Sequence, residues 1–146
     1  HGGGARTFTV THSSNATYRT VIAAEFSGVA TTGAFEGKAA GQGASSTTPA
    51  TANLDVTPSV NGILVVGLGN FGATPTAGSP FTLIRYDGSV TRGHAEYYVQ
   101  PTAADIAANW TQAAQDYNTI AASFKPVAAG GLSIPVAAAL YRQMRA

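Results

Sequence analysis

Cysteine is absent from this 146-residue chain, and charged residues are scarce. Without a thiol the chain forms no disulfide, binds no metal through thiolate and uses no cysteine nucleophile. Only 10% of the residues are charged, where roughly a quarter is usual in a globular domain. The eight Lys and Arg and seven Asp and Glu are scattered, so there is neither a basic stripe for nucleic acid nor an acidic run. We expect a surface solvated by Thr, Ser, Asn and Gln, with large neutral areas available for packing.

Long apolar runs are also missing. The longest falls far short of the ~20 residues that a membrane helix needs, and no signal-peptide pattern is visible. The length suits one domain that buries a real core. Because the chain starts at His1 and not at Met, we expect a processed, recombinant or fragmentary chain.

Apolar and polar residues alternate with a period of two, which predicts β-strands. The continuous apolar run that follows Asn61-Gly62 indicates a central strand covered on both faces. Asp87-Gly88 predicts a hairpin between the strands on either side of it. The predicted strands are Tyr18–Phe26, Ile63–Leu68, Phe81–Tyr86, Gly93–Gln100 and Asn118–Lys125, with weaker candidates at Arg6–Val10, Thr51–Val56 and Ile106–Thr111.

Three segments allow two interpretations each. Gly37–Pro49 is rich in Ala, Gly, Ser and Thr and is either a flexible loop or a weak edge strand. Pro101–Gln115 has a helix-capping arrangement at its start, although Asn109–Thr111 suits a strand slightly better. After Gly130-Gly131, residues 132–146 form either an extended arm or a short helix from Val136. The strands and turns together predict an all-β antiparallel sandwich over residues 1–129 and a C-terminal arm or helix over residues 130–146.

One eight-residue pattern occurs twice, as Ile22-Ala-Ala-Glu-Phe-Ser-Gly-Val29 and as Ile120-Ala-Ala-Ser-Phe-Lys-Pro-Val127. Either two core strands converged on common residues, or two halves of the sandwich end in equivalent strands. If the two halves are equivalent, the half that ends in the first copy has fewer predicted strands than the half that ends in the second copy. The chain is then a fragment, the strands are dispensable, or a neighbouring subunit supplies a strand to the exposed edge.

The order of five motifs resembles jelly-roll-like β-sandwich proteins of tailed-phage virions and secreted bacterial surface proteins. The motifs are Phe26-Ser-Gly-Val29, Gly62-Ile-Leu-Val-Val-Gly67, Ala77-Gly-Ser-Pro-Phe-Thr-Leu-Ile84, Trp110-Thr111 and Ile120-Ala-Ala-Ser-Phe-Lys125. The resemblance spans Thr7 to Val127 and implies a jelly-roll-like sandwich in a virion or an extracellular setting. Members typically carry further strands before the part that corresponds to Tyr18.

Candidate metal and cofactor sites are weak. His1, His12 and His94 lack the close spacing of zinc ligands, and no acidic loop suits calcium. Gly67–Gly72 matches the glycine spacing of a dinucleotide-binding loop, but the Pro-containing segment that follows cannot open the helix that such a site requires. We therefore predict neither a metal nor a cofactor.

Two pairs of residues are candidate catalytic groups. Glu25 and Glu96 occupy strand positions and could face one groove as a glycosidase pair, but solvated strand residues explain them better. His94 and Glu96 point to the same face of one strand, without the Gly-x-Ser-x-Gly turn of a serine hydrolase. The sequence therefore predicts a protein that is not an enzyme and has no catalytic residues.

Two surfaces are the predicted contact regions. Leu132, Ile134, Val136, Leu140 and Tyr141 are the residues expected to touch a neighbouring copy. Trp110, Tyr97 and Tyr98 are possible glycan-stacking residues, although a core or interface role for them is favoured.

We expect a structural subunit of an assembly, first a phage virion (capsid decoration, fibre or tail surface), that binds copies of itself and possibly a capsid or tail protein, with no nucleic acid or membrane partner. The alternatives are a carbohydrate-binding module or adhesin, and a subunit of an extracellular bacterial filament.

Overall fold

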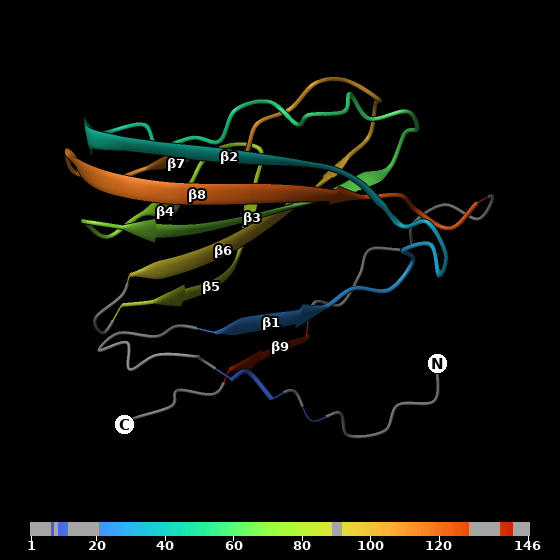
Figure 1. Ribbon diagram of the computed structural model, residues 1–146, viewed down its shortest axis with the longest axis horizontal. Helices are drawn as coiled ribbons and strands as arrows, with labels where there is room; N and C mark the ends of the chain where they lie inside the picture. The colour runs from blue at the N-terminus through green and yellow to red at the C-terminus, as the bar shows by residue number, and fades with distance from the viewer. Residues whose placement is uncertain (1–6, 8, 12–20, 89–91, 129–137, 142–146) are drawn as a thin grey trace.

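The computed structural model describes residues 7, 9–11, 21–88, 92–128 and 138–141, which form nine strands and, within those ranges, no helix (Figure 1). The all-β prediction is confirmed. The strands are β1 (Ile22–Glu25), β2 (Phe35–Ser46), β3 (Ile63–Phe71), β4 (Thr76–Ala77), β5 (Thr82–Asp87), β6 (Gly93–Gln100), β7 (Trp110–Thr111), β8 (Gln115–Phe124) and β9 (Ala138–Tyr141).

Five strands form the main antiparallel sheet, in the order β2-β8-β3-β6-β5. The apolar strand β3 lies in the middle, as the run after Asn61-Gly62 predicts, because side chains on both of its faces are buried. β5 and β6 pair as the predicted hairpin, with Thr82 opposite Tyr97. The sequence therefore located this half of the sheet correctly.

A second layer covers one face of this sheet. Residues 49–55 hydrogen-bond to β2 on one side and to residues 106–110 on the other, and β7 in turn pairs with β4. The second layer is thus hydrogen-bonded to the main sheet along β2, where the sheet turns a corner. The weak strand candidates at 51–56 and 106–111 lie in this second layer. The bonds run from Ala52 N to Ala40 O, Asp55 N to Lys38 O, Thr51 N to Ala108 O and Trp110 N to Pro49 O, at 2.8–2.9 Å.

Glycines make the corner at β2 possible. A Cβ added to Gly41 would lie 2.0 Å from the carbonyl oxygen of Ala50, and one added to Gly43 would lie 2.8 Å from the ring of Tyr117. The crossing segment therefore approaches β2 more closely than any side chain allows. Of the two interpretations of Gly37–Pro49, the strand is correct, and at 12 residues β2 is the longest strand described.

The core fills the space between the sheet and this second layer. Ile63 and Val65 of β3 face it, together with Trp110 of β7. The rings of Phe71 and Trp110 lie 5.3 Å apart, and Phe81 and Tyr98 pair at 5.7 Å. We call this the inner face of the sheet. The cluster consists of Leu54, Ile63, Val65, Phe71, Phe81, Ala108, Trp110 and Ala121.

The opposite, outer face carries Leu64, Ala95 and Tyr97, and the antiparallel pair β1–β9 covers part of it. The Phe26 ring, which follows β1, lies 5.5 Å from the Tyr97 ring. Leu64 and Ala95 are almost fully buried although they point away from the core cluster. The described chain therefore has a third layer on the outer face.

Four residues of the C-terminal segment pair with a strand of the same chain. Residues 138–141 form β9 and pair antiparallel with β1, with Ile22 opposite Tyr141. This pairing satisfies backbone groups of β1 that an exposed edge would leave open. The predicted helix from Val136 is wrong for the four residues of β9; its other residues, like those of Tyr18–Phe26 before residue 21, lie outside the described ranges.

The two copies of the repeated pattern meet at their ends. Ala30 N donates to Lys125 O and Val127 N donates to Gly28 O, both at 2.9 Å. The first copy starts in β1 and the second in β8, so the copies belong to different sheets. They are therefore joined to each other without occupying equivalent positions in one sheet.

Candidate functional site

The inner face of β6 carries three polar side chains into the core. His94 is 1% exposed, Glu96 is 0% exposed and Gln100 is buried. His94 and Glu96 lie two residues apart on one strand and therefore share a face, as the sequence predicts. Polar side chains in a core require hydrogen-bond partners, and the three differ in whether they have them.

His94 is held by the chain's single tryptophan. The indole Nε1 of Trp110 donates a hydrogen bond of 3.0 Å to His94 Nδ1, and the two rings stand edge to face. Because Nδ1 accepts, the neutral ring carries its proton on Nε2. Burial lowers the pKa of His94 to about 4, so the ring is neutral at pH 7.

Glu96 lies deeper and lacks side-chain partners. Burial raises the pKa of its carboxyl to about 8, and the nearby backbone of Asn109 opposes that rise only in part. Both oxygens are buried, and neither has a well-formed hydrogen bond among the described residues. Its Cγ lies 3.1 Å from where a Cβ on Gly67 would be, so the glycine makes room for it. The carboxyl is therefore protonated at neutral pH.

The interpretation of Glu96 as a solvated strand residue is wrong, because the side chain is enclosed in the core. Glu25 is exposed on β1, so the structure does not bring Glu25 and Glu96 to one groove. His94 and Glu96 share a face, and both are buried, at 1% and 0% exposed.

No group of three or more potential metal ligands is found in the described ranges. His1 and His12 lie outside them. No helix within these ranges is long and apolar enough to cross a membrane.

The aromatic residues predicted as a possible glycan platform do not form one. Trp110 is 1% exposed and belongs to the core, so its ring faces are not available to a sugar. Tyr98 packs on Phe81 against the same core, whereas Tyr97 packs on Phe26 on the outer face. The tyrosines thus face opposite sides of β6, as their adjacency predicts, and both are partly buried.

A groove of about 920 Å³ lies on the outer face, near the ends of four strands. Its apolar walls come from the segment before β1, from β1 itself and from β3 and β8. Its exposed polar groups are carboxamides from three adjacent strands, and the buried residues His94 and Thr119 also belong to its lining. The lining residues are Val10, Val21, Ile22, Ala40, Gly41, Gln42, Leu68, Gly69, Asn70, Gly93, His94, Asn118, Thr119 and Ile120.

The three carboxamides form a row across the sheet, which we call the amide row. Asn118 of β8 lies between Gln42 of β2 and Asn70 of β3 and is the register partner of both. All three are exposed, and no side-chain hydrogen bond is found for them among the described residues. Sequence reasoning missed this row because only the strand register brings together residues so far apart in the chain.

The predicted partner-contact residues are only partly placed. Leu132, Ile134 and Val136 lie outside the described residues. Leu140 and Tyr141 are in β9, where their backbones pair with Ala23 and Ile22, and their side chains are outside what is described.

Comparison with protein families, curated proteins and solved structures found no match to this chain. The resemblance to virion and bacterial surface proteins therefore stays a prediction. The fold and the two faces of its main sheet are the ground for any functional argument.

Proposed function

We propose that this chain is a non-enzymatic structural subunit of an assembly whose copies meet through apolar packing and strand pairing. The observation that carries the proposal is an exposed apolar surface at one end of the main sheet. Phe35 is 55% exposed, and its ring meets the ring of Phe124 edge to face at 6.2 Å. Val127 is exposed at the same end. We call these three residues the aromatic end.

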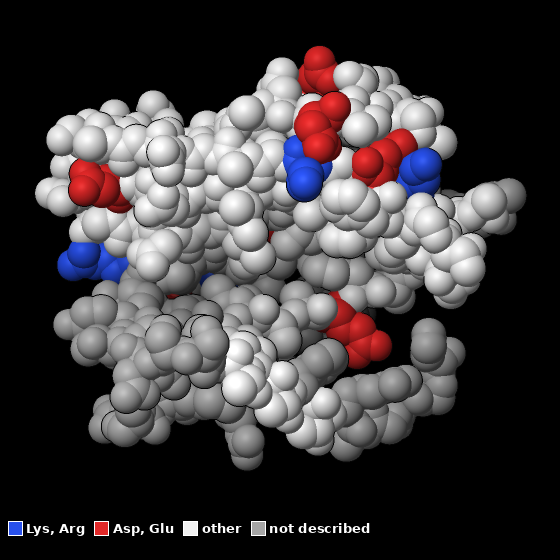
Figure 2. Space-filling view, viewed as in Figure 1, with Lys and Arg blue, Asp and Glu red and all other residues white. Residues whose placement is uncertain are grey.

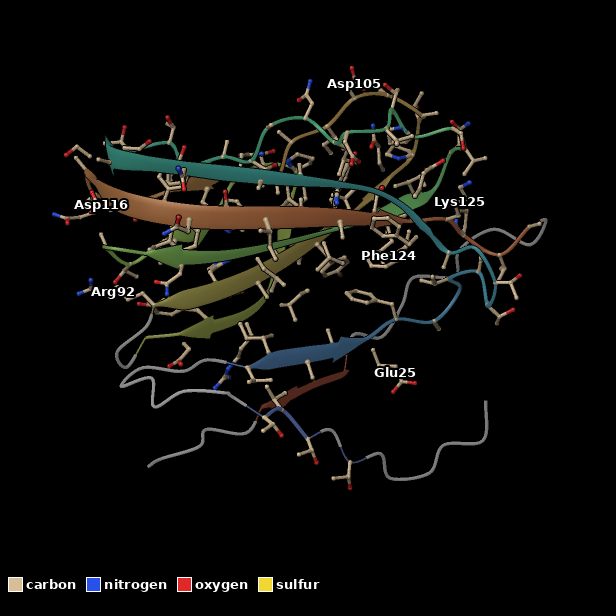
Figure 3. The ribbon with its side chains drawn as sticks, viewed as in Figure 1. Glu25, Arg92, Asp105, Asp116, Phe124 and Lys125 are labelled. Carbon is tan, nitrogen blue, oxygen red and sulfur yellow. The ribbon has the colours of Figure 1, made fainter. Side chains whose placement is uncertain are left out.

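The strand ends hold these residues together. Lys125 N donates to Ala34 O at 2.7 Å, which fixes the start of β2 beside the end of β8. Figure 3 shows Phe124 and Lys125 at one end of β8, and Asp116 and Arg92 at the other. A large aromatic side chain that stays exposed on a well-paired strand is typical of a contact surface.

Charged side chains lie close to this surface. Figure 2 shows that few side chains on this face of the molecule are charged, and that several of them gather in the half where Phe124 and Lys125 lie. Glu36 and Lys125 form an ion pair of 3.5 Å next to the aromatic end. A second copy that packs on the aromatic end would leave this ion pair at the solvent-accessible rim of the contact.

Strand pairing between copies has its own support. The β1–β9 ladder joins residues far apart in the chain and has four residue pairs. The same ladder forms equally well when β9 comes from a second copy, which is how domain swapping links protomers. Leu132, Ile134 and Val136, which the sequence predicts as contact residues, precede β9 in the chain. The resemblance described above makes a virion the first assembly to examine.

Light scattering after size exclusion, over a range of protein concentrations, tests the proposal. We expect the full chain to show a mass above that of one copy, and Phe35→Lys to lower it by placing a charge in the contact. Leu83→Lys is the matched control, because Leu83 is 50% exposed on strand β5. A full chain that is monomeric throughout, or a Phe35→Lys variant with unchanged mass, contradicts the proposed function.

A further inference from the structure

The amide row gives the outer groove a regular hydrogen-bonding floor. Gln42, Asn118 and Asn70 stand opposite one another on neighbouring strands, and the row continues to Gly93 on β6. Adjacent strands lie ~4.8 Å apart, so the row presents a carboxamide at each such step across the sheet. A linear occupant of the groove would therefore lie across the strands and meet the amides in turn.

The groove has the chemistry of a site for an uncharged ligand. A carboxamide offers both a donor and an acceptor, and the three of the amide row have no side-chain hydrogen bonds among the described residues. Among the described residues that line the groove, none is Asp, Glu, Lys or Arg. The walls are aliphatic, from Val21 and Ile22 on one side to Leu68 and Ile120 on the other. An ionic ligand would lose its hydration here without gaining a counter-charge.

We propose that this groove binds a neutral, hydroxyl-rich chain, an oligosaccharide that lies across β2, β8 and β3. Sugar hydroxyls both donate and accept, which matches the carboxamides of Gln42, Asn118 and Asn70. The C–H faces of the sugar rings suit aliphatic walls. The groove also falls within the range of ~300–1,000 Å³ that is usual for ligand sites.

An extended peptide fits the same row less well. Its side chains and backbone groups repeat on one side only every second residue, about 6.6 Å apart, which does not match the ~4.8 Å step between strands. A peptide that crosses the strands would also form no main-chain ladder with the sheet. A sugar ring carries hydroxyls around its whole circumference, so its groups meet the amides without such a mismatch.

This inference goes beyond the assembly role and does not depend on it. The amide row lies toward the Asp116 and Arg92 end of the sheet, and the aromatic end lies at the other. Substitutions in one surface therefore leave the other intact. Loss of glycan binding and loss of assembly are separate results.

The experiment is a titration of the full chain with neutral linear oligosaccharides of glucose, mannose, xylose and N-acetylglucosamine, followed by amide NMR and calorimetry. We expect the side-chain amide signals of Gln42, Asn70 and Asn118 to shift with at least one of them. Asn118→Ala should weaken that binding about tenfold or more, because it removes the centre of the row. Asn53→Ala is the control, since Asn53 is an exposed amide outside the groove.

Binding that Asn118→Ala weakens and Asn53→Ala does not supports the inference, provided that circular dichroism shows both variants folded. The inference is overturned if no sugar binds at millimolar concentration, or if binding survives Asn118→Ala. It is overturned as well if a neutral extended peptide shifts the three amides and the sugars do not, or if the amides shift on dilution of the protein alone, which would identify a second copy as the occupant.

Discussion

The two faces of the main sheet each carry exceptions to the usual distribution of polarity. The inner face buries His94 and Glu96 beside Trp110, whereas the outer face leaves Ile120 55% exposed. Inner-face hydroxyls on β8 are bonded to the backbone of β2, as Ser123 is to Gly37 at 3.0 Å. The Glu96 carboxyl has no such hydrogen bond among the described residues. Its pKa is raised to about 8, so the carboxyl is uncharged at neutral pH. The comparison teaches that polarity along a strand does not decide which of its faces becomes the core.

The largest expected effect lies at the centre of the inner face. Trp110→Ala should lower the free energy of unfolding by about 3–5 kcal/mol, because it leaves a cavity and removes the partner of His94 Nδ1. Urea denaturation followed by far-UV circular dichroism measures it. A loss below 1 kcal/mol, on the scale of an exposed site, would mean that the inner face is not the core.

The corner at β2 comes next. Gly41→Ala should cost about 3 kcal/mol, since the new methyl group would meet the Ala50 backbone, which cannot move without breaking the second layer. Ala40→Ser, on the neighbouring residue of β2, is the control and should change stability little. Equal melting temperatures for the two variants would show that the close crossing is not required.

The buried carboxyl predicts an unusual dependence of stability on pH. The folded pKa of Glu96 is raised to about 8 from 4.5, so the folded state holds a proton that the unfolded state releases, and stability falls as pH rises through that range. The folded pKa of His94 is lowered to about 4 from 6.5, so its contribution falls as pH drops below 6.5 and offsets that of Glu96 there.

Between pH 6.5 and 8 the effect of Glu96 therefore stands alone and amounts to about 2 kcal/mol. Urea denaturation at a series of pH values measures it, and Glu96→Gln should abolish the slope. A wild-type stability that is constant or rises from pH 6.5 to 8 would show that the carboxyl is not buried as described.

The smallest effect belongs to the outer face. Ile120→Thr should change the free energy of unfolding by less than about 0.5 kcal/mol, because the side chain is exposed and a β-branched residue is kept. Thermal denaturation at low protein concentration gives the value for one copy. A decrease of more than 2 kcal/mol in the free energy of unfolding would show that Ile120 belongs to a second core on the outer face.

The sequence predicted the regular strands and the central place of β3, but not the environment of the other strands. Ile63–Leu68 and Gly93–Gln100 were found because alternation and branched residues mark strands whatever covers them. β2 stayed ambiguous because its glycines, needed at the close crossing, give no apolar period. The burial of Glu96 was missed, since only the closure of the second layer encloses it. The amide row was missed because strand order and register are not written in local patterns.

The hydrogen bond between Trp110 and His94 has a practical consequence. With one indole in the chain, ultraviolet emission comes mainly from a single place between the sheet and the second layer. The fluorescence of Trp110 therefore reports on the core, because its emission wavelength changes when water reaches the indole. Protonation of the His94 imidazole at low pH would remove the acceptor of the indole N–H. The Trp110 fluorescence would then change before the rest of the molecule responds.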